Sequence, residues 1–127
     1  MDGKVVVITG ASGALGSVVA EAAVARGARV AAVDYAASTA ADTPSRITLG
    51  GVDLSDAAQA GTAIDAIAAR FGRIDALINI AGAFAFETVA DGNAATGPRL
   101  YNINVLTALN ASRAALAHLG RSPAGRI

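Results

Sequence analysis

Apolar residues along this chain follow two alternating patterns. Short apolar runs rich in β-branched residues predict four strands, at Val5–Thr9, Arg29–Asp34, Ile47–Asp53 and Ile74–Ile80. Between them, apolar residues recur at a helical spacing and predict three helices, at Leu15–Arg26, Ser55–Phe71 and Leu100–Leu119. Strands that alternate with helices of this length predict a parallel α/β sheet built from right-handed βαβ units.

The ends of these elements carry residues that commonly start or stop helices. Gly27 and Gly72 are expected to end the first two helices, Ser55 to cap the second, and Pro98 to lie near the start of the last. The stripe of the first helix expected to face the sheet consists of Leu15, Val18, Val19, Ala22 and Ala23. Residues 36–45 fit either a short helix or a loop.

These elements predict one domain over residues 1–127, a Rossmann-like doubly wound parallel sheet with strand order 3-2-1-4. Arg126 and Ile127 are expected to begin a fifth strand, so the predicted sheet is truncated there. Ligands bind such sheets outside the carboxyl ends of the strands, where the strand order reverses. Functional residues are therefore expected just after the strands.

Composition limits the partners of the protein. The formal net charge is zero and 54% of the residues are hydrophobic, which favours a folded core and gives no basic surface for nucleic acid. No apolar run is long enough to span a membrane, and the N-terminus lacks the layout of a signal peptide. Cysteine is absent, and no spacing of His and Asp resembles a metal site. We expect a cytoplasmic protein without a metal.

The turn after the first strand is the main candidate binding element. Gly10, Gly13 and Gly16 recur at a spacing of three, between the end of a predicted strand and the start of a predicted helix. Such a turn presents backbone N–H groups and the positive end of the helix dipole to a phosphate. Glycine triplets also occur in ordinary turns between a strand and a helix. The surrounding residues must therefore show whether this turn binds a phosphate.

Asp34 ends the second predicted strand at the distance expected for a ribose-binding carboxylate. A carboxylate there accepts hydrogen bonds from the adenosine ribose of NAD and repels the 2′-phosphate of NADP. The neighbouring Tyr35 and Ala36 supply no arginine that would offset this repulsion. The pattern favours NAD over NADP, and a solvated strand-end aspartate is the alternative.

Further motifs complete a family resemblance. With Asp53-Leu54, the stretch Asn79-Ile80-Ala81-Gly82 and Asn104 added to Thr9–Gly16, the whole chain resembles the N-terminal half of a short-chain dehydrogenase/reductase. The resemblance implies a cofactor site made of Gly10, Ser12, Gly13, Ala14, Leu15, Gly16, Asp34, Tyr35, Asp53, Leu54, Asn79, Ala81 and Gly82. It places Asp53 at the adenine amino group, Leu54 beside the adenine ring, and Asn104 at the water-holding position of the catalytic proton relay.

Three departures from the family pattern matter. Ala14 stands where the commonest spacing has its second glycine, and Ile80 replaces the usual second asparagine. The family also transfers hydride with the help of a tyrosine and a lysine four residues later, which lowers the pKa of the tyrosine. The tyrosines are Tyr35 and Tyr101, the single lysine is Lys4, and no Tyr-x-x-x-Lys occurs. The missing residues would follow Ile127.

The resemblance implies an NAD(P)-dependent oxidoreductase that interconverts an alcohol and a carbonyl, with this segment supplying the cofactor site. The 127 residues alone are predicted to be inactive. A non-catalytic NAD-binding module and an interaction protein are the alternatives. Family members commonly form dimers or tetramers, and a small-residue face of Ala108, Ala111 and Ala115 would allow a close helix contact or pack on the sheet.

Several polar and aromatic residues have simpler structural interpretations. His118, in the last turn of a helix, is expected to interact with the helix dipole. Asp65 and Asp75 are expected to be solvated, and Tyr101 to pack in the first turn of the last helix. Phe84 and Phe86 are expected to pack under their loop or to line a substrate pocket.

Overall fold

A computed structural model describes residues 1–38 and 41–127. A parallel sheet of four strands runs through its centre, in the order β3-β2-β1-β4. The strands are β1 (Val5–Thr9), β2 (Arg29–Val33), β3 (Arg46–Leu49) and β4 (Ala76–Asn79). This order confirms the predicted doubly wound fold.

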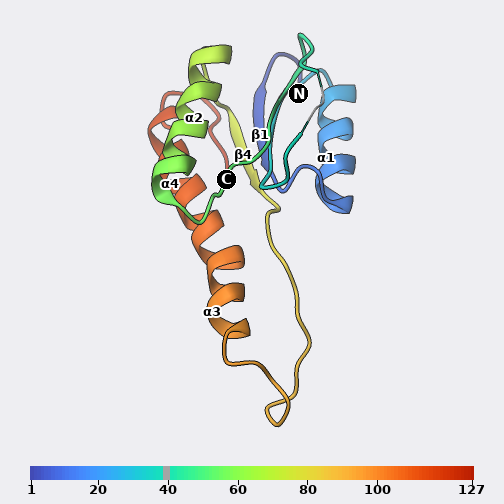
Figure 1. The fold of residues 1–127 in the computed structure, drawn as a ribbon. Helices are drawn as coiled ribbons and strands as arrows, with labels where there is room; N and C mark the ends of the chain where they lie inside the picture. The colour runs from blue at the N-terminus through green and yellow to red at the C-terminus, as the bar shows by residue number, and fades with distance from the viewer. Residues whose placement is uncertain (39–40) are drawn as a thin grey trace.

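Helices cover both faces of the sheet. The helical elements are α1 (Ala14–Ala25), α2 (Ala57–Phe71), α3 (Thr96–Tyr101), the π-helical segment η1 (Asn102–Leu106) and α4 (Thr107–Leu119). Figure 1 shows α2 and α4 on one side of the sheet and α1 on the other. None of the helices in the described part of the chain combines the length and the apolar character that crossing a membrane requires.

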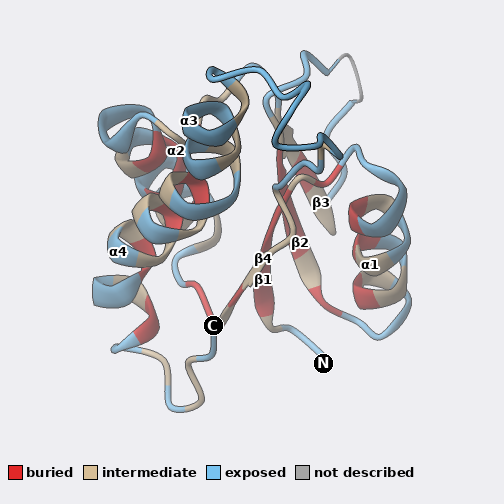
Figure 2. Cartoon of the chain, turned by 90° about the horizontal axis from the view of Figure 1, so that it is seen from below, coloured by how far each residue is buried: buried red, intermediate tan, exposed pale blue. Residues whose placement is uncertain are grey.

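The core has two layers, divided by the sheet. Val5 and Val7 of β1 pack with α2 and α4, while the alternate residues Val6 and Ile8 pack with α1. All residues of β1 are buried, as expected for a central parallel strand covered on both faces. In Figure 2, β1 and most of β2 are buried, β3 and β4 are mostly intermediate, and the outer sides of the helices are exposed.

Two strands and one cap differ from the sequence-based expectation. β3 ends at Leu49 instead of residue 53, and the chain leaves the strand conformation at Gly51, which has a φ of +73°. β4 is shorter than residues 74–80 at both ends. The N-cap of α2 is Asp56, whose Oδ1 accepts the N–H groups of residues 58 and 59 at 2.8 and 3.2 Å. Ser55, the predicted cap, donates its hydroxyl hydrogen to Asp53 instead, at 2.7 Å.

The first helix presents a different face to the sheet than predicted. Leu15 and Val18 are 63% and 61% exposed, whereas Gly16, Ala20 and Ala23 are buried. Gly16 lies directly against the backbone of the glycine turn, so the helix approaches the sheet along its small residues. The predicted stripe was therefore right for Ala23 and wrong for Leu15 and Val18.

The segments around β4 and the last helix also refine the prediction. The described part of residues 36–45 contains no helix, and residues 39–40 lie outside the described part. The last helix begins at Thr96, before Pro98, and the N–H of Thr107 bonds to the carbonyl of Asn102 in π-helical fashion. Arg126 forms a parallel bridge with Ala76 on the outer edge of β4, where a fifth strand was predicted.

Aromatic and small residues of the last third do not all lie where expected. Residues 80–88 have no regular structure and project from the body together with α3 (Figure 1). Phe84 and Phe86 are 86% and 83% exposed, so they do not pack under this loop, and Tyr101 is also exposed. Ala111 and Ala115 are fully buried in the core that α2 and α4 share, so this face of the helix packs inside the molecule.

Candidate functional site

A pocket of about 670 Å³ lies at the carboxyl ends of the strands. Its walls come from the turn after β1, the ends of β2 and β4, the segment between β3 and α2, and the last helix. The predicted residues that line it are Gly10, Gly13, Ala14, Leu15, Gly16, Asp34, Tyr35, Asp53, Leu54, Ala81 and Gly82. Separate elements of the sequence thus meet at the point where the strand order reverses.

The glycine turn forms one wall of this pocket in a conformation that needs its glycines. Gly10 has a φ of +66°, and a Cβ there would lie 2.8 Å from the backbone of Ala81. A Cβ on Gly16 would overlap the carbonyl oxygen of Gly10. Gly13 is the N-cap of α1, and no side chain caps the first N–H groups of this helix. The turn therefore leaves backbone donors at the positive end of a helix facing the pocket.

Asp34 is held at the pocket edge by two backbone groups. Its Oδ2 accepts the N–H of Ser12 at 2.8 Å, and its Oδ1 accepts the N–H of Ala36 at 2.9 Å. A carboxylate has about four acceptor positions, so hydrogen bonds to a ligand remain possible. Tyr35 beside it is 76% exposed. Ser12, predicted as a cofactor residue, is outside the pocket lining, and its backbone N–H donates to Asp34.

The segment before α2 supplies a mixed polar and apolar wall. Asp53 Oδ1 accepts both the N–H and the hydroxyl of Ser55, at 2.9 and 2.7 Å. Its other oxygen, Oδ2, has no hydrogen-bond partner among the described residues. Leu54 is buried and lies next to it in the pocket wall. An acceptor beside an apolar side chain suits a flat heteroaromatic ring with an amino group.

The end of β4 is fixed to β1 by one hydroxyl. Thr9 Oγ1 accepts the N–H groups of Ile80 and Ala81 at 3.0 and 3.1 Å, which turns the chain across the end of β1. Asn79, a predicted cofactor residue, lies outside the pocket lining and donates from Nδ2 to Ser112 of α4 at 3.1 Å. Ile80 packs into the core under α1, so its apolar side chain is accommodated there.

Asn104 lies in the π-helical segment and holds the loop after β4. Its Oδ1 accepts the N–H of Ala83 at 3.1 Å, and its Nδ2 donates to the carbonyls of Ala83 and Leu100, both at 2.9 Å. A Cβ on Gly82 would lie 2.7 Å from Asn104 Oδ1, so a larger residue there would have to displace the Asn104 side chain. The side-chain amide of Asn104 is thus engaged with backbone, and it is not part of the pocket lining.

Some lining residues were missed by the sequence analysis, namely Val52, Ser55, Ile80, Ile103 and Thr107. Ile103 and Thr107 lie on either side of Asn104, one turn apart, on a single face of the last helix. The helical spacing alone indicates that these two residues point the same way. Val52 and Ser55 flank the predicted pair Asp53-Leu54, and only the bend of the chain shows that they share its wall.

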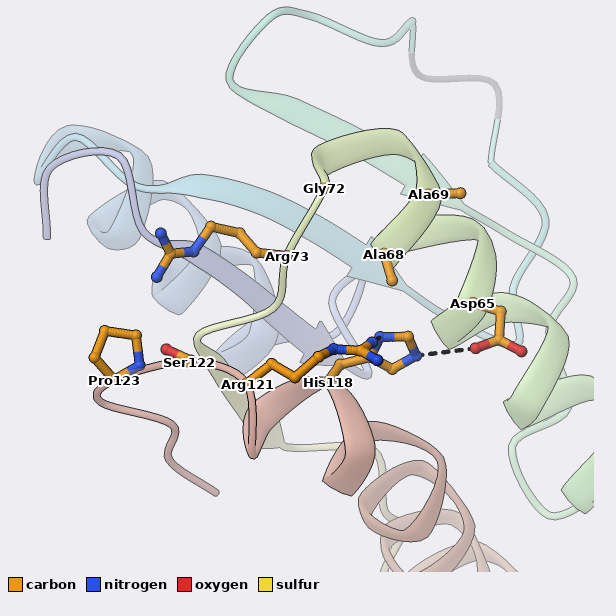
Figure 3. Close-up of a pocket in the computed structure, with 9 residues that line it drawn as sticks. All are labelled: Asp65, Ala68, Ala69, Gly72, Arg73, His118, Arg121, Ser122 and Pro123. Carbon is orange, nitrogen blue, oxygen red and sulfur yellow. Dashed lines mark hydrogen bonds and ion pairs between the residues drawn. The ribbon is translucent and has the colours of Figure 1, made fainter.

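A second cavity, of about 510 Å³, lies at the opposite edge of the sheet, between the end of α2 and the end of α4. Figure 3 shows His118 of α4 reaching Asp65 of α2, with an Nε2–Oδ1 distance of 2.9 Å. Arg121 donates to Nδ1 of the same ring at 2.7 Å. His118 therefore joins two helices, and Asp65, though exposed, is paired.

Asp75, at the same edge, is not solvated as predicted. It is 3% exposed, accepts the N–H of Val5 and the hydroxyl of Ser122 at 2.9 and 2.6 Å, and also bonds to Arg73. Burial raises the pKa of this carboxyl, but the bonds from Ser122, Val5 and Arg73 outweigh it and lower the pKa to about 2. Lys4 also approaches it, at 3.7 Å.

Comparisons with known proteins agree with this geometry. The family model described as short chain dehydrogenase matches residues 4–127. An uncharacterized oxidoreductase of Methylorubrum extorquens is 38% identical over 129 residues, covering 94% of this chain and 52% of that protein. D-threitol dehydrogenase of Mycolicibacterium smegmatis is 44% identical over 91 residues, covering 65% of this chain and 34% of its own length.

Solved structures show the same arrangement. A short-chain dehydrogenase/reductase from Brucella melitensis, described as glucose/ribitol dehydrogenase, superposes with a TM-score of 0.85 at 27% identity and covers 94% of this chain and 51% of its own. Aldohexose dehydrogenase of Thermoplasma acidophilum gives a TM-score of 0.81 at 28% identity, over 94% of this chain and 45% of its own. The chain spans about half the length of these proteins.

Proposed function

The chain belongs to the short-chain dehydrogenase family, and on this premise we propose that it is the NAD(P)-binding part of an oxidoreductase that interconverts an alcohol and a carbonyl. The observation that carries the proposal is the meeting of the glycine turn, Asp34 and the Asp53-Leu54 pair in one pocket at the carboxyl ends of the strands. When bound, the nicotinamide cofactor supplies the hydride acceptor or donor. The residues of this chain bind and orient it.

The pocket has the groups that a dinucleotide needs. The uncapped N-terminus of α1 and the cradle at Gly10 and Gly16, which a Cβ would fill, suit a pyrophosphate. Asp34 suits the ribose hydroxyls of the adenosine, and Leu54 with the free oxygen of Asp53 suits adenine. Residues 1–127 would then form one cofactor-binding domain.

The proposal assigns no complete catalytic centre to these residues. Lys4 pairs with Asp75 at the amino-terminal edge of the sheet. It therefore lies away from Tyr35 at the pocket edge and from Tyr101 in α3. Asn104 holds the loop after β4 in place through hydrogen bonds to backbone, and its role in a proton relay stays a prediction. Residues 1–127 alone are therefore expected to bind the cofactor without turning over an alcohol.

Assembly into a homodimer or tetramer is also proposed. Of the two alternatives for the small-residue face, packing inside the molecule fits the burial of Ala111 and Ala115, so the proposed contact uses another face. The buried Ala111 and Ala115 are not available for a partner. Val105, Leu109 and Leu116 are 43%, 46% and 57% exposed on the outward face of the last helix, and an exposed apolar stripe of this kind suits a second copy. The small-molecule substrate would be an alcohol or its carbonyl partner in a protein that retains the rest of the fold.

Direct binding tests the cofactor proposal. Isothermal titration of the purified chain with NAD is expected to give a dissociation constant of about 1 mM or tighter, in the range of substrates of such enzymes. The same chain mixed with NAD and a series of small alcohols is expected to form no reduced cofactor. A chain that binds neither NAD nor NADP would instead favour an interaction protein, and turnover would overturn the proposed inactivity.

Replacing Asp34 by alanine tests cofactor preference. The change removes the ribose acceptor and the charge that opposes a 2′-phosphate, so NAD binding is expected to weaken by about tenfold to a hundredfold. NADP binding is expected to fall less or to improve. Asp65→Ala, which removes an equal charge at the opposite edge of the sheet, is the control. An unchanged ratio of the two dissociation constants would refute the role of Asp34.

A further inference from the structure

Asn110 joins the last helix to the wall of the pocket. Its Nδ2 donates to two consecutive backbone carbonyls, those of Leu54 at 3.1 Å and Ser55 at 2.9 Å. These carbonyls belong to the segment that turns from β3 into α2, more than fifty residues earlier in the chain. The side chain is partly buried, and Asn110 itself does not line the pocket.

The chemistry of this contact selects an amide. The two carbonyl oxygens lie on successive residues, so one nitrogen with two N–H groups can bond to both. The NH₂ group of an amide is such a donor and carries no charge. A leucine of similar size supplies none, and an aspartate would bring its own acceptor against both oxygens. In either case two partly buried carbonyls would lose their partners.

The other hydrogen bonds of this segment lead to the end of β2 and to the first turn of α2. Val52 bonds to the backbone of Asp34, Asp53 to Ser55, and the N–H of Asp53 to Gln59 in the first turn of α2. Within the described part of the chain, Asn110 is the one side chain of the last helix that hydrogen-bonds to it. Removing this contact leaves the segment without a side-chain hydrogen bond to the last helix among the described residues.

The same helix face also reaches the pocket directly. Ile103, Thr107 and Asn110 succeed one another at the spacing of one helical turn, and the first two line the pocket. The last helix therefore lines the pocket with Ile103 and Thr107. Through Asn110 it also bonds to the wall that carries Leu54 and Ser55.

We propose that Asn110 is a positioning residue that holds Asp53 and Leu54 in the place where they meet the adenine end of the cofactor. The proposal rests on the proposed cofactor site. In this proposal the last helix, which also carries Asn104, sets the width of the pocket at the end where adenine would bind. The glycine turn, which has no contact with Asn110, is unaffected by it.

The test compares Asn110→Asp with Asn102→Asp, an equal change at an exposed position one helix segment earlier. Isothermal titration with NAD, AMP and inorganic pyrophosphate is the readout. For Asn110→Asp we expect NAD and AMP to bind about tenfold more weakly, through loss of the two hydrogen bonds, and pyrophosphate to bind as before. Asn102→Asp is expected to change none of the three. Unchanged AMP binding, or equal weakening of AMP and pyrophosphate, would overturn the proposal.

A second readout does not depend on any cofactor. Amide hydrogen exchange at residues 54–56 is expected to rise about tenfold in Asn110→Asp relative to the buried turns of α2, and to stay unchanged in Asn102→Asp. If exchange rises equally over the whole chain, Asn110 only stabilises the fold and the proposal fails. If the wild-type chain binds no dinucleotide while exchange rises locally, the proposed function fails and the positioning role of Asn110 stands. Asn110→Ala, which adds no charge, replaces Asn110→Asp if the latter does not fold.

Discussion

Replacing Gly16 by alanine is expected to abolish measurable cofactor binding and to destabilise the fold. A Cβ at this position would overlap the carbonyl oxygen of Gly10 and lie 2.8 Å from Cα of Ala11, and both neighbours are backbone that no side-chain rotation can relieve. The start of α1 must therefore move away from the turn. We expect a loss in affinity of at least about a hundredfold, because two or more hydrogen bonds from the turn to a charged pyrophosphate would be lost, and about 3 kcal/mol less stability.

Gly61 provides a matched control for this change. It lies within α2, and a Cβ there would meet nothing within 4 Å. Gly61→Ala is expected to leave NAD binding unchanged and to raise the free energy of unfolding by about 0.5 to 1 kcal/mol, because glycine is a poor helix residue. Urea denaturation and titration calorimetry measure both effects. Wild-type affinity in Gly16→Ala would show that the pocket does not depend on this close approach.

Replacing Asp75 by asparagine is expected to have the largest effect at the opposite edge of the sheet. The carboxylate joins the start of β1 through Val5, the approach to β4 through Arg73, and the segment after α4 through Ser122. Removing the charge leaves Arg73 without its ionic partner, and the NH₂ group of an asparagine must face either the Arg73 guanidinium or the Val5 N–H, both of which are donors. We expect Asp75→Asn to lower the free energy of unfolding at neutral pH by about 3 kcal/mol.

The pKa of Asp75 gives this prediction a pH dependence. The pKa is about 2 in the folded chain and 3.8 in a free side chain, so the folded state prefers the charged form. The stability that the Asp75 carboxylate contributes is fully present at pH values above its pKa in the unfolded chain. It is lost as the pH falls through its pKa in the folded chain. Between about pH 5 and about pH 2 the wild type should lose about 2 kcal/mol through Asp75, and Asp75→Asn should not.

Urea denaturation across this pH range measures the difference between the two proteins. The gap between wild type and Asp75→Asn should narrow as the pH falls. Asp2→Asn removes an exposed carboxylate near the same edge and is expected to change stability by less than about 0.5 kcal/mol. A gap that stays constant from pH 7 to pH 2 would mean that the charge of Asp75 contributes nothing to the folded state.

The sheet order, and the meeting of most candidate residues in one pocket, were predictable because both rest on local patterns. The β-branched run before Gly10 identifies β1, and the acid at the end of the second strand identifies β2. In a parallel sheet the carboxyl ends of these strands lie at the same edge. Side-chain burial was less predictable. Asp75 is buried only because Val5 and Ser122, distant in sequence, supply its hydrogen bonds. Leu15 points outward because the close approach of Gly16 sets the rotation of α1, which the apolar spacing does not contain.

The last helix shows a similar limit. Its periodicity predicts a helix but not the π-helical segment around Asn104, whose side chain bonds to the loop after β4. The contact between Asn110 and the carbonyls of Leu54 and Ser55 has no local sequence signal either. Polar residues on an apolar helix face were visible in the sequence, and the structure identifies what they bind.

The loop that projects between β4 and α3 has a consequence for handling the protein. Phe84 and Phe86 stand in an extended, unprotected backbone with their rings in solvent, which is the form in which a chymotrypsin-like protease accepts its substrate. A cut there would separate the segment carrying the glycine turn and Asp34 from the one carrying the last helix. The two pieces would still be held together by the packing of α2 against α4. Limited digestion is thus a route to a nicked, non-covalent complex in which the two walls of the pocket come from different chains.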